Sequence, residues 1–308
     1  MAAFQSGNAW QGVAIMKIGL VGLGRMGSAI AQRLTEQGFE IVAWDHAEKP
    51  RKAAADRGVR VAPNPRAIAA ETEIAISIIT EDNGVRKMFT GENGLLTTDV
   101  EGRLFIEMST LQPMTGRELA PVVEAKGARL IESPVLGTIP SVREGKLLSL
   151  AGGRAEDVER ARVVLDKLAR RIVHMGPNGS GYAMKLAVNL GLGAYIQALS
   201  ESLALGMTQG LTLAQMLDVL KEAPTATGWL QSKIPVLLGG KAEVTLDIRT
   251  MRKDIMSAVA TGALSGVPMP LGAGTLAAFS AAVAGGAGDG DLAELAQFAR
   301  QKMLQNFG

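Results

Sequence analysis

The first half of the chain alternates short apolar runs with stretches of helical character. Between Lys17 and about Met175 the short runs are rich in β-branched residues. This alternation is typical of a largely parallel sheet with helices on its faces. It predicts an α/β fold with a doubly wound sheet whose strands are Lys17–Val21, Glu40–Trp44, Val59–Val61, Ile74–Ile79, Leu104–Met108, Arg129–Glu132, Leu147–Ala151 and Arg171–His174.

The pattern changes at residues 176–181, where Gly-Pro-Asn-Gly-Ser-Gly forms a cluster of turn formers. Beyond it β-like runs nearly vanish, and a long apolar helix is predicted from about Tyr182 to Gln209, followed by shorter helices. Glycines along the long helix permit close backbone approach, and a face this apolar must be covered, for which a partner subunit is a candidate. The Ala/Gly-rich tract Ala281–Gly290 is predicted to be a loop.

These boundaries predict three segments: an N-terminal extension over residues 1–15, a sheet domain over residues 16–177 and an all-helical domain over residues 178–308. The first sixteen residues carry no charge and so lack the basic start of a signal peptide. The apolar stretch Leu186–Met207 is interrupted by Asn189, Gln197 and Glu201, which favours a buried helix over a membrane span. We expect a cytoplasmic protein without a membrane partner.

Composition excludes several classes of protein. The chain is 47% hydrophobic and 20% charged, and its net charge is +2 from 32 basic and 30 acidic residues, which is typical of a globular protein. The balanced charge lacks the basic stripe that nucleic-acid binding needs. With no cysteine and only His46 and His174, we expect no disulfide framework, no thiolate catalysis and no metal site.

A glycine-rich motif follows the first predicted strand. It comprises Gly22, Leu23, Gly24, Arg25, Met26 and Gly27, and the helix after it is predicted from Ser28 to Gln37. The first glycine allows a tight turn, the second lets the backbone approach a pyrophosphate, and the third lets the helix pack on the strand. The helix N-terminus then faces the negative charge. The motif predicts a Rossmann-type dinucleotide-binding domain.

An acidic residue, Asp45, ends the second strand at the expected distance of roughly 20 residues. It can accept hydrogen bonds from both ribose hydroxyls and would repel a 2′-phosphate, which favours NAD over NADP. Positive charge on His46, Lys49 and Arg51 leaves NADP possible, and His46 is itself a candidate cofactor contact. The alternative interpretation of Asp45 is a solvated carboxylate or turn cap.

With these residues in view, the chain resembles the β-hydroxyacid dehydrogenase family, which includes 3-hydroxyisobutyrate dehydrogenase and tartronate semialdehyde reductase. The resemblance runs from Met16 through nearly the whole chain and rests on segments in the same order. They are GLGRMGSAIAQRL at Gly22–Leu34, ESPVLGTIPSVREG at Glu132–Gly145, GSGYAMKLAVN at Gly179–Asn189, and Lys253-Asp254. The last pair resembles a lysine-aspartate pair that borders the cofactor site.

The third segment contains the two residues that we expect to take part in catalysis. Lys185 and Asn189 are four residues apart on the long helix, so their side chains share a face and can reach one substrate. By resemblance Lys185 is the proton donor and acceptor, a role that requires a depressed pKa. Asn189 would orient the substrate. The alternatives are a lysine that snorkels to water and a buried amide that satisfies nearby backbone.

Two further segments follow the fourth and fifth strands, at the edge where doubly wound sheets bind ligands. By resemblance Ile79, Thr80 and Thr110 touch the cofactor, as does Lys253, while Ser109 faces nicotinamide or substrate. Capping of the following turn is the alternative role of the hydroxyls.

The substrate loop departs from the family pattern Asp-Ala-Pro-Val-Ser-Gly-Gly. Here Leu136 replaces the serine, Gly137 is kept and Thr138 replaces the last glycine. A leucine donates no hydrogen bond, so the substrate carboxylate must be held by Thr138 and backbone N–H groups, or the substrate differs in shape or polarity. Thr138 keeps a hydroxyl nearby, which suggests a relocated donor.

The resemblance implies NAD(P)-dependent hydride transfer on a β-hydroxyacid or its semialdehyde, in a homodimer or homotetramer. Two alternatives stay open. One is an imine reductase of the same superfamily, favoured by Leu136 and opposed by Lys185. The other is a cofactor-dependent binding protein without catalysis. 6-Phosphogluconate dehydrogenase is a more distant relative with a larger helical half.

Overall fold

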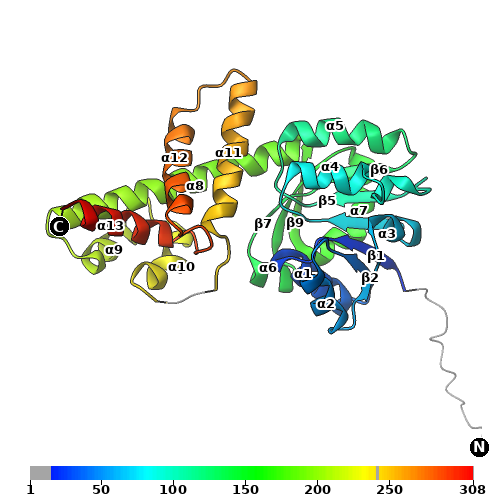
Figure 1. Cartoon of the computed structure of the whole chain (residues 1–308), viewed down its shortest axis with the longest axis horizontal. Coiled ribbons are helices and arrows are strands. Elements are labelled where there is room, and N and C mark those ends of the chain that lie inside the picture. The colour runs from blue at the N-terminus through cyan, green and yellow to red at the C-terminus, as the bar shows by residue number, and fades with distance from the viewer. Residues whose placement is uncertain (1–14, 241–242, 308) are drawn as a thin grey trace, which may run out of the picture.

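The structure is a computed structural model that describes residues 15–240 and 243–307, with side chains described up to residue 300. The extension expected over residues 1–15 lies outside these ranges except for Ile15. Figure 1 shows a sheet domain and a helical domain that are connected by one long helix.

One mixed sheet forms the centre of the first domain. Its strands are β1 (Lys17–Val21), β2 (Glu40–Trp44), β3 (Arg60–Val61), β4 (Ile74–Ser77), β5 (Leu104–Glu107), β6 (Arg129–Glu132), β7 (Val135–Leu136), β8 (Leu147–Gly152) and β9 (Ala169–Gly176). The first six are parallel in the order β3-β2-β1-β4-β5-β6, which is the dinucleotide-binding topology. β8 pairs antiparallel with β6 and β7 and parallel with β9.

Helices cover both faces of this sheet. They are α1 (Arg25–Glu36), α2 (Glu48–Ala55), α3 (Pro65–Glu71), α4 (Asp82–Thr90), the short 3-10 helix η1 (Leu95–Thr97), α5 (Pro113–Glu124), α6 (Ile139–Arg143) and α7 (Ala155–Leu168). One core lies between the sheet and α1, α6 and α7, and the other between the sheet and α3, α4 and α5. Because both faces are covered, the central strands are apolar throughout: β4 and β5 are buried at every position.

The second domain is all-helical. It contains α8 (Ser180–Thr208), α9 (Leu213–Leu220), α10 (Gly228–Leu237), α11 (Ile248–Leu264), α12 (Pro270–Ala284) and α13 (Glu294–Phe307). α8 begins against the sheet domain and runs through the helical domain, where its apolar side chains contribute to two cores. This single helix therefore extends from the sheet domain to the far end of the helical domain (Figure 1).

The α/β architecture and the long helix agree with the sequence-based predictions. Three details differ. α1 begins at Arg25, inside the glycine motif, because the motif itself forms the first turn. The two-residue strand β7 was not predicted because it is too short to show alternation. The loop prediction for Ala281–Gly290 is wrong at its start: α12 continues to Ala284, consistent with the high helix propensity of alanine.

Within the described residues, no helix combines the length and apolar character needed to cross a membrane.

Candidate functional site

The glycine motif adopts a turn that only glycine permits. Gly22 has φ +101°, and a Cβ there would lie 2.1 Å from the carbonyl oxygen of Ile78. A Cβ on Gly27 would lie 2.0 Å from the carbonyl oxygen of Gly22. Side chains at either position would push α1 away from the sheet, so these glycines fix the helix against the end of β1.

Gly24 differs because nothing lies within 4 Å of where its Cβ would be. It is the N-cap residue of α1, which has no side-chain cap and no acidic residue in its first turn. Open space beside bare N–H groups at the positive end of a helix is the geometry that accommodates a phosphate. The residues present therefore fit a dinucleotide pyrophosphate.

Asp45 is nearly buried, with 7% of its surface exposed. Its carboxylate accepts hydrogen bonds from the N–H of Leu23 at 2.7 Å and the N–H of Ala47 at 2.8 Å. His46 Nδ1 lies 3.2 Å from the same carboxylate. Asp45 thus braces the glycine turn, and because each carboxylate oxygen accepts two hydrogen bonds, acceptor positions remain for ribose hydroxyls.

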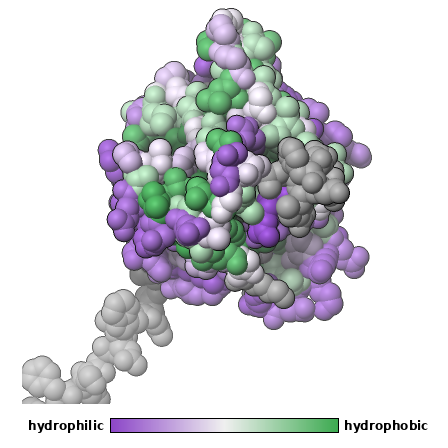
Figure 2. Space-filling model, turned by 90° about the vertical axis from the view of Figure 1, so that its left-hand side faces the viewer, coloured by the Kyte–Doolittle hydropathy of each residue, from purple (hydrophilic) through white to green (hydrophobic). Residues whose placement is uncertain are grey.

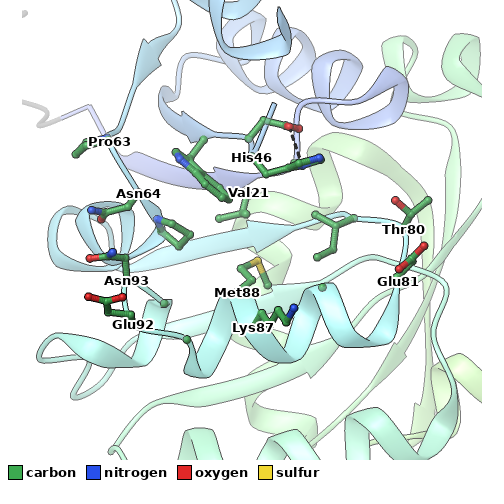
Figure 3. Close-up of a pocket in the computed structure, with 18 residues that line it drawn as sticks. Val21, His46, Pro63, Asn64, Thr80, Glu81, Lys87, Met88, Glu92 and Asn93 are labelled. Carbon is green, nitrogen blue, oxygen red and sulfur yellow. Dashed lines mark ion pairs between the residues drawn. The ribbon is translucent and has the colours of Figure 1, made fainter. Parts of the chain in front are cut away.

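A cavity of about 710 Å³ lies beside this aspartate. In Figure 3, Pro63 and Asn64 lie at one end of the cavity, Thr80 and Glu81 at the other, and Met88 lies on α4 between them. Of the predicted cofactor contacts, those that line it are Gly22, Asp45, His46, Ile79 and Thr80. Sequence reasoning missed the rest of the lining, namely Val21, Trp44, Pro63, Asn64, Pro65, Glu81, Gly84, Lys87, Met88, Gly91, Glu92, Asn93 and Gly94.

Arg51, a possible source of compensating charge, contacts the turn after β2 through one of its nitrogens. Its Nη1 donates to the carbonyl oxygens of Asp45 at 2.8 Å and His46 at 3.2 Å. The guanidinium therefore holds the turn after β2. His46 is exposed, with 87% of its side chain accessible, and lies at the cavity wall.

The ends of β4 and β5 are tied together at the carboxyl edge of the sheet. Ser109 Oγ accepts a hydrogen bond from the N–H of Ile79 at 2.8 Å. Glu107, fully buried, accepts from the N–H of Ser109 at 2.7 Å and from the hydroxyl of Ser77. Burial raises the pKa of Glu107 to about 7, against the hydrogen bonds from Ser109 and Ser77. Ser109 is itself buried, so here it orders the loop that carries Ile79.

Lys185 lies on the second turn of α8, where the helix leaves the sheet domain. Its Nζ donates to the carbonyl oxygen of Val135 in β7 at 2.9 Å. Burial lowers the pKa of Lys185; the negative charge of Asp254 opposes this shift, and the positive charge of Lys253 adds to it. The chain thus places an amine with a depressed pKa beside the predicted substrate loop.

Residues from α8 and α11 meet next to this amine. Asn189 Nδ2 donates to Asp254 Oδ2 at 2.6 Å, and Lys253 Nζ lies 2.8 Å from Asp254 Oδ1. Lys253 Nζ also donates to the carbonyl oxygen of Thr110 at 2.6 Å. A network therefore runs from the loop after β5 to α8, and Asp254, buried at its centre, holds both neighbours. Sequence reasoning noted Asp254 only as part of a pair.

The substrate loop lies beside Val135. Leu136 is partly buried, and Gly137 has φ +140° with its would-be Cβ 2.6 Å from the side chain of Leu147. Thr138 is the N-cap residue of α6; its N–H donates to Ser141 Oγ at 3.3 Å, and its side chain is exposed. No described contact joins Thr138 to Lys185.

The structure brings most predicted site residues to one region, along the carboxyl edge of the parallel strands and the start of α8. Gly22, Asp45 and Ile79 line the cavity, Ser109 and Thr110 follow β5, and Lys185 lies near the start of α8. This arrangement offers a dinucleotide cradle next to a basic amine, an amide and a second cation.

Comparisons with known proteins match the two domains separately. Residues 17–176 match the family described as the NAD binding domain of 6-phosphogluconate dehydrogenase. Residues 179–299 match the family described as the NAD-binding of NADP-dependent 3-hydroxyisobutyrate dehydrogenase. The two matches together span both the sheet domain and most of the helical domain.

Whole-chain relatives agree. The chain is 28% identical to glyoxylate/succinic semialdehyde reductase 1 of Arabidopsis thaliana, over 93% of this chain and 100% of that protein. It is 30% identical to 3-hydroxyisobutyrate dehydrogenase of Pseudomonas aeruginosa, over 83% and 88%. The structure of Mycobacterium tuberculosis 3-hydroxyisobutyrate dehydrogenase with L-serine superposes with a TM-score of 0.82 at 26% identity, covering 93% of this chain and 100% of that one. The chain therefore belongs to the β-hydroxyacid dehydrogenase family of NAD(P)-dependent oxidoreductases, with 3-hydroxyisobutyrate dehydrogenase among its members.

Proposed function

We propose that this protein transfers a hydride between NAD(H) and a β-hydroxyacid or its semialdehyde, with Lys185 as the proton donor and acceptor. The observation that carries the proposal is the position of Lys185. Its amine has a lowered pKa, lies beside the substrate loop and is held by the carbonyl oxygen of Val135.

The reaction needs a proton relay at the substrate oxygen. The nicotinamide ring supplies the hydride acceptor in oxidation and the hydride donor in reduction when it is bound. In oxidation the neutral amine of Lys185 takes the proton from the substrate hydroxyl, and in reduction its ammonium form returns the proton to the oxygen. A lowered pKa raises the neutral fraction near physiological pH, as the oxidation direction requires.

Neighbouring residues of α8, α11 and the substrate loop complete the proposed site. Asn189 is buried and held by Asp254, and its remaining amide atoms would contact the substrate hydroxyl or carboxylate. Lys253 adds positive charge at the loop after β5, where it would favour an anionic substrate and the cofactor. Thr138, Gly137 and the backbone beside Leu136 would receive the acid group, with Leu136 excluding polar substituents.

The cofactor proposal is NAD in preference to NADP. Asp45 places a negative charge at the cavity wall, and a 2′-phosphate there would meet repulsion. Arg51 donates through Nη1 to the carbonyl oxygens of Asp45 and His46, and its positive charge beside Asp45 leaves NADP possible. Lys49 and His46 keep NADP as the second cofactor to test.

The relatives suggest which substrates to try. Their names point to glyoxylate, succinic semialdehyde and 3-hydroxyisobutyrate, and one was solved with L-serine, which is itself a 3-hydroxyacid. A substrate panel should contain these acids and the matching semialdehydes, each with NAD(H) and NADP(H). Because Leu136 cannot donate a hydrogen bond, we expect turnover to favour members with an apolar substituent near the carboxylate.

The deciding comparison is wild type against Lys185→Ala. We expect the variant to lose kcat by a factor of about 10² to 10⁴, the usual contribution of a positioned acid or base. Its NADH affinity should stay within about twofold, because Lys185 lies outside the cofactor cavity. Equal turnover by the two proteins would refute the proposed role of Lys185.

We also propose that the protein forms a homodimer or homotetramer through its helical domain. Leu264, Val267 and Leu271 are more than half exposed around the α11–α12 turn. Figure 2 shows apolar side chains on the surface of the helical domain among polar ones. The mass in solution, measured by light scattering after size-exclusion chromatography, tests this proposal.

A further inference from the structure

The start of α8 has no cap of its own. Gly179, its N-cap residue, has no side chain and adopts φ +96°, and the first turn contains no acidic residue. The first N–H groups of a helix have no partner within the helix, so they need acceptors from elsewhere when they are buried. Gly179, Gly181 and Tyr182 are buried at the start of α8, so their N–H groups need acceptors from the protein.

Glu132, at the end of β6, supplies those acceptors. Its Oε2 accepts from the N–H of Gly179 at 2.8 Å, and its Oε1 accepts from Gly181 at 2.6 Å and Tyr182 at 3.4 Å. The remaining N–H of this turn, from Ser180, donates to the carbonyl oxygen of Pro177. One carboxylate, 47 residues earlier in the chain, therefore does the capping that a serine or aspartate at the N-cap position usually does.

The space around this carboxylate is lined by glycines. A Cβ on Gly116 would lie 2.6 Å from Oε2, a Cβ on Gly152 would lie 2.2 Å from Oε1, and a Cβ on Gly181 would lie 3.2 Å from Cγ. Three glycines from α5, β8 and α8 thus leave the space that the Glu132 side chain occupies. Glu132 is 1% exposed.

Burial and the capping contacts act on this carboxylate in opposite directions. Burial raises the pKa of Glu132 to about 7, while the three backbone N–H groups and the charge of Arg117 oppose the rise. The negative form also faces the positive end of the α8 dipole.

Glu132 and Val135 belong to one short segment, and both hold α8. The carboxylate of Glu132 holds the N–H of Gly181, and the carbonyl oxygen of Val135 holds the amine of Lys185, four residues further along the helix. Residues four apart lie one above the other on a helix face. The hydrogen bond between Glu132 and Gly181 fixes the first turn of α8. It therefore sets the distance between the amine of Lys185 and the carbonyl oxygen of Val135.

We propose that Glu132 is a positioning residue for Lys185, which it holds against the substrate loop by capping the first turn of α8. Only the expected effect of Glu132 on turnover rests on the proposed function. Glu132 has no described contact with the side chain of Lys185 and acts through the helix backbone.

Two substitutions separate the effect of the negative charge of Glu132 from the effect of its side-chain length. In Glu132→Gln the side-chain nitrogen cannot accept a hydrogen bond, so one side of the cap is lost with little change of volume. In Glu132→Asp the charge remains, but the side chain is one methylene shorter and reaches fewer of the N–H groups. The matched control is Asp157→Asn, which neutralises another buried carboxylate of the same domain, in the first turn of α7.

Two measurements need no substrate. Amide hydrogen exchange of residues 180–186, followed by mass spectrometry, reports opening of the first turn. The rate at which acetic anhydride acylates Lys185 reports access to its amine. We expect Glu132→Gln to raise both by about tenfold, as the loss of one charge-assisted hydrogen bond predicts. Glu132→Asp should fall between Gln and wild type, and Asp157→Asn should match wild type.

The kinetic measurement uses the best substrate of the panel. We expect kcat of Glu132→Gln to fall by about 10- to 100-fold, as for a misplacement of about 1 Å, while the substrate KM changes less than about threefold. Unchanged exchange and acylation in Glu132→Gln would overturn the proposal, and so would equal changes in Asp157→Asn. If wild type turns over no substrate, the proposed function fails, but exchange and acylation still decide whether Glu132 positions Lys185.

Discussion

Arg25, in the glycine motif, forms an ion pair with Asp247, the N-cap residue of α11, with 2.5 Å between Nη2 and Oδ2. Its Nη1 also donates to the carbonyl oxygen of Val244 at 2.9 Å. The loop that would receive a pyrophosphate is thereby joined to the helix that carries Lys253 and Asp254. Arg25 therefore joins the glycine motif to the helical domain.

Replacement of this arginine should weaken cofactor binding. In Arg25→Ala the cation at the N-terminus of α1 is lost, and we expect the Kd for NADH to rise by about 3- to 10-fold, within the usual strength of a charge-assisted contact. Stability should change by less than about 1 kcal/mol because the ion pair is half exposed. NADH fluorescence titration measures the first effect. Arg33→Ala, further along α1, is the control, and equal Kd values for the two variants would contradict the prediction.

The pH dependence of oxidation should report Lys185 and its neighbour Asp254. Oxidation needs the neutral amine, so kcat/KM should rise with pH to a plateau, with its midpoint below the ordinary lysine pKa because burial lowers the pKa of Lys185. The charge of Asp254 opposes that shift, so Asp254→Asn should move the midpoint to lower pH. Asp289→Asn, exposed and remote, serves as control. A midpoint that moves upward in Asp254→Asn would show that another group titrates.

Asp45 should control the choice between the two dinucleotides. Asp45→Asn removes the charge that repels a 2′-phosphate but keeps an oxygen for the N–H of Leu23. We expect the ratio of kcat/KM for NADP to that for NAD to rise by about 10-fold or more, roughly the 1.4 kcal/mol expected of one removed charge contact. Glu48→Gln, close by on α2, should leave the ratio unchanged. If the two variants give the same ratio, Asp45 acts only as the turn brace that its hydrogen bonds describe.

Stability should fall as pH rises through neutrality. Burial raises the folded-state pKa of Glu107 to about 7 from an ordinary value of 4.5. The folded state therefore binds a proton more tightly than the unfolded chain, and the stability this contributes is complete below about pH 4.5 and lost as pH rises through about 7. The loss is on the order of 3 kcal/mol for a buried carboxyl with this shift.

Glu107→Gln tests this stability prediction because an amide can serve both Ser109 and Ser77 without ionising. Urea unfolding at pH 5 and pH 8 should show a smaller loss of stability in the variant than in wild type. Some loss should remain, because burial also raises the pKa of Glu132 to about 7. Parallel declines in the two proteins would mean that Glu107 is not the titrating group.

The sequence by itself predicted the features that depend on local spacing. Short β-branched runs predicted most of the strands, and the long apolar stretch after the turn cluster predicted α8. The glycine motif with Asp45 predicted the dinucleotide turn, because turn geometry is a property of a short segment. The helical period alone places Lys185 and Asn189 on one face. Resemblance to a family, rather than spacing, predicted what these two residues do.

Only the tertiary structure decided the partners of these residues. Val135 receives the amine of Lys185 because β7 lies beside α8, and Asp254 reaches Asn189 across 65 residues because α11 packs against the same helix. The cap that Glu132 provides for α8 spans 47 residues and depends on glycines from three elements. Such contacts depend on how complete helices and strands pack together. Hydrophobic periodicity indicates only which face of an element is buried. It does not indicate which other element will cover that face.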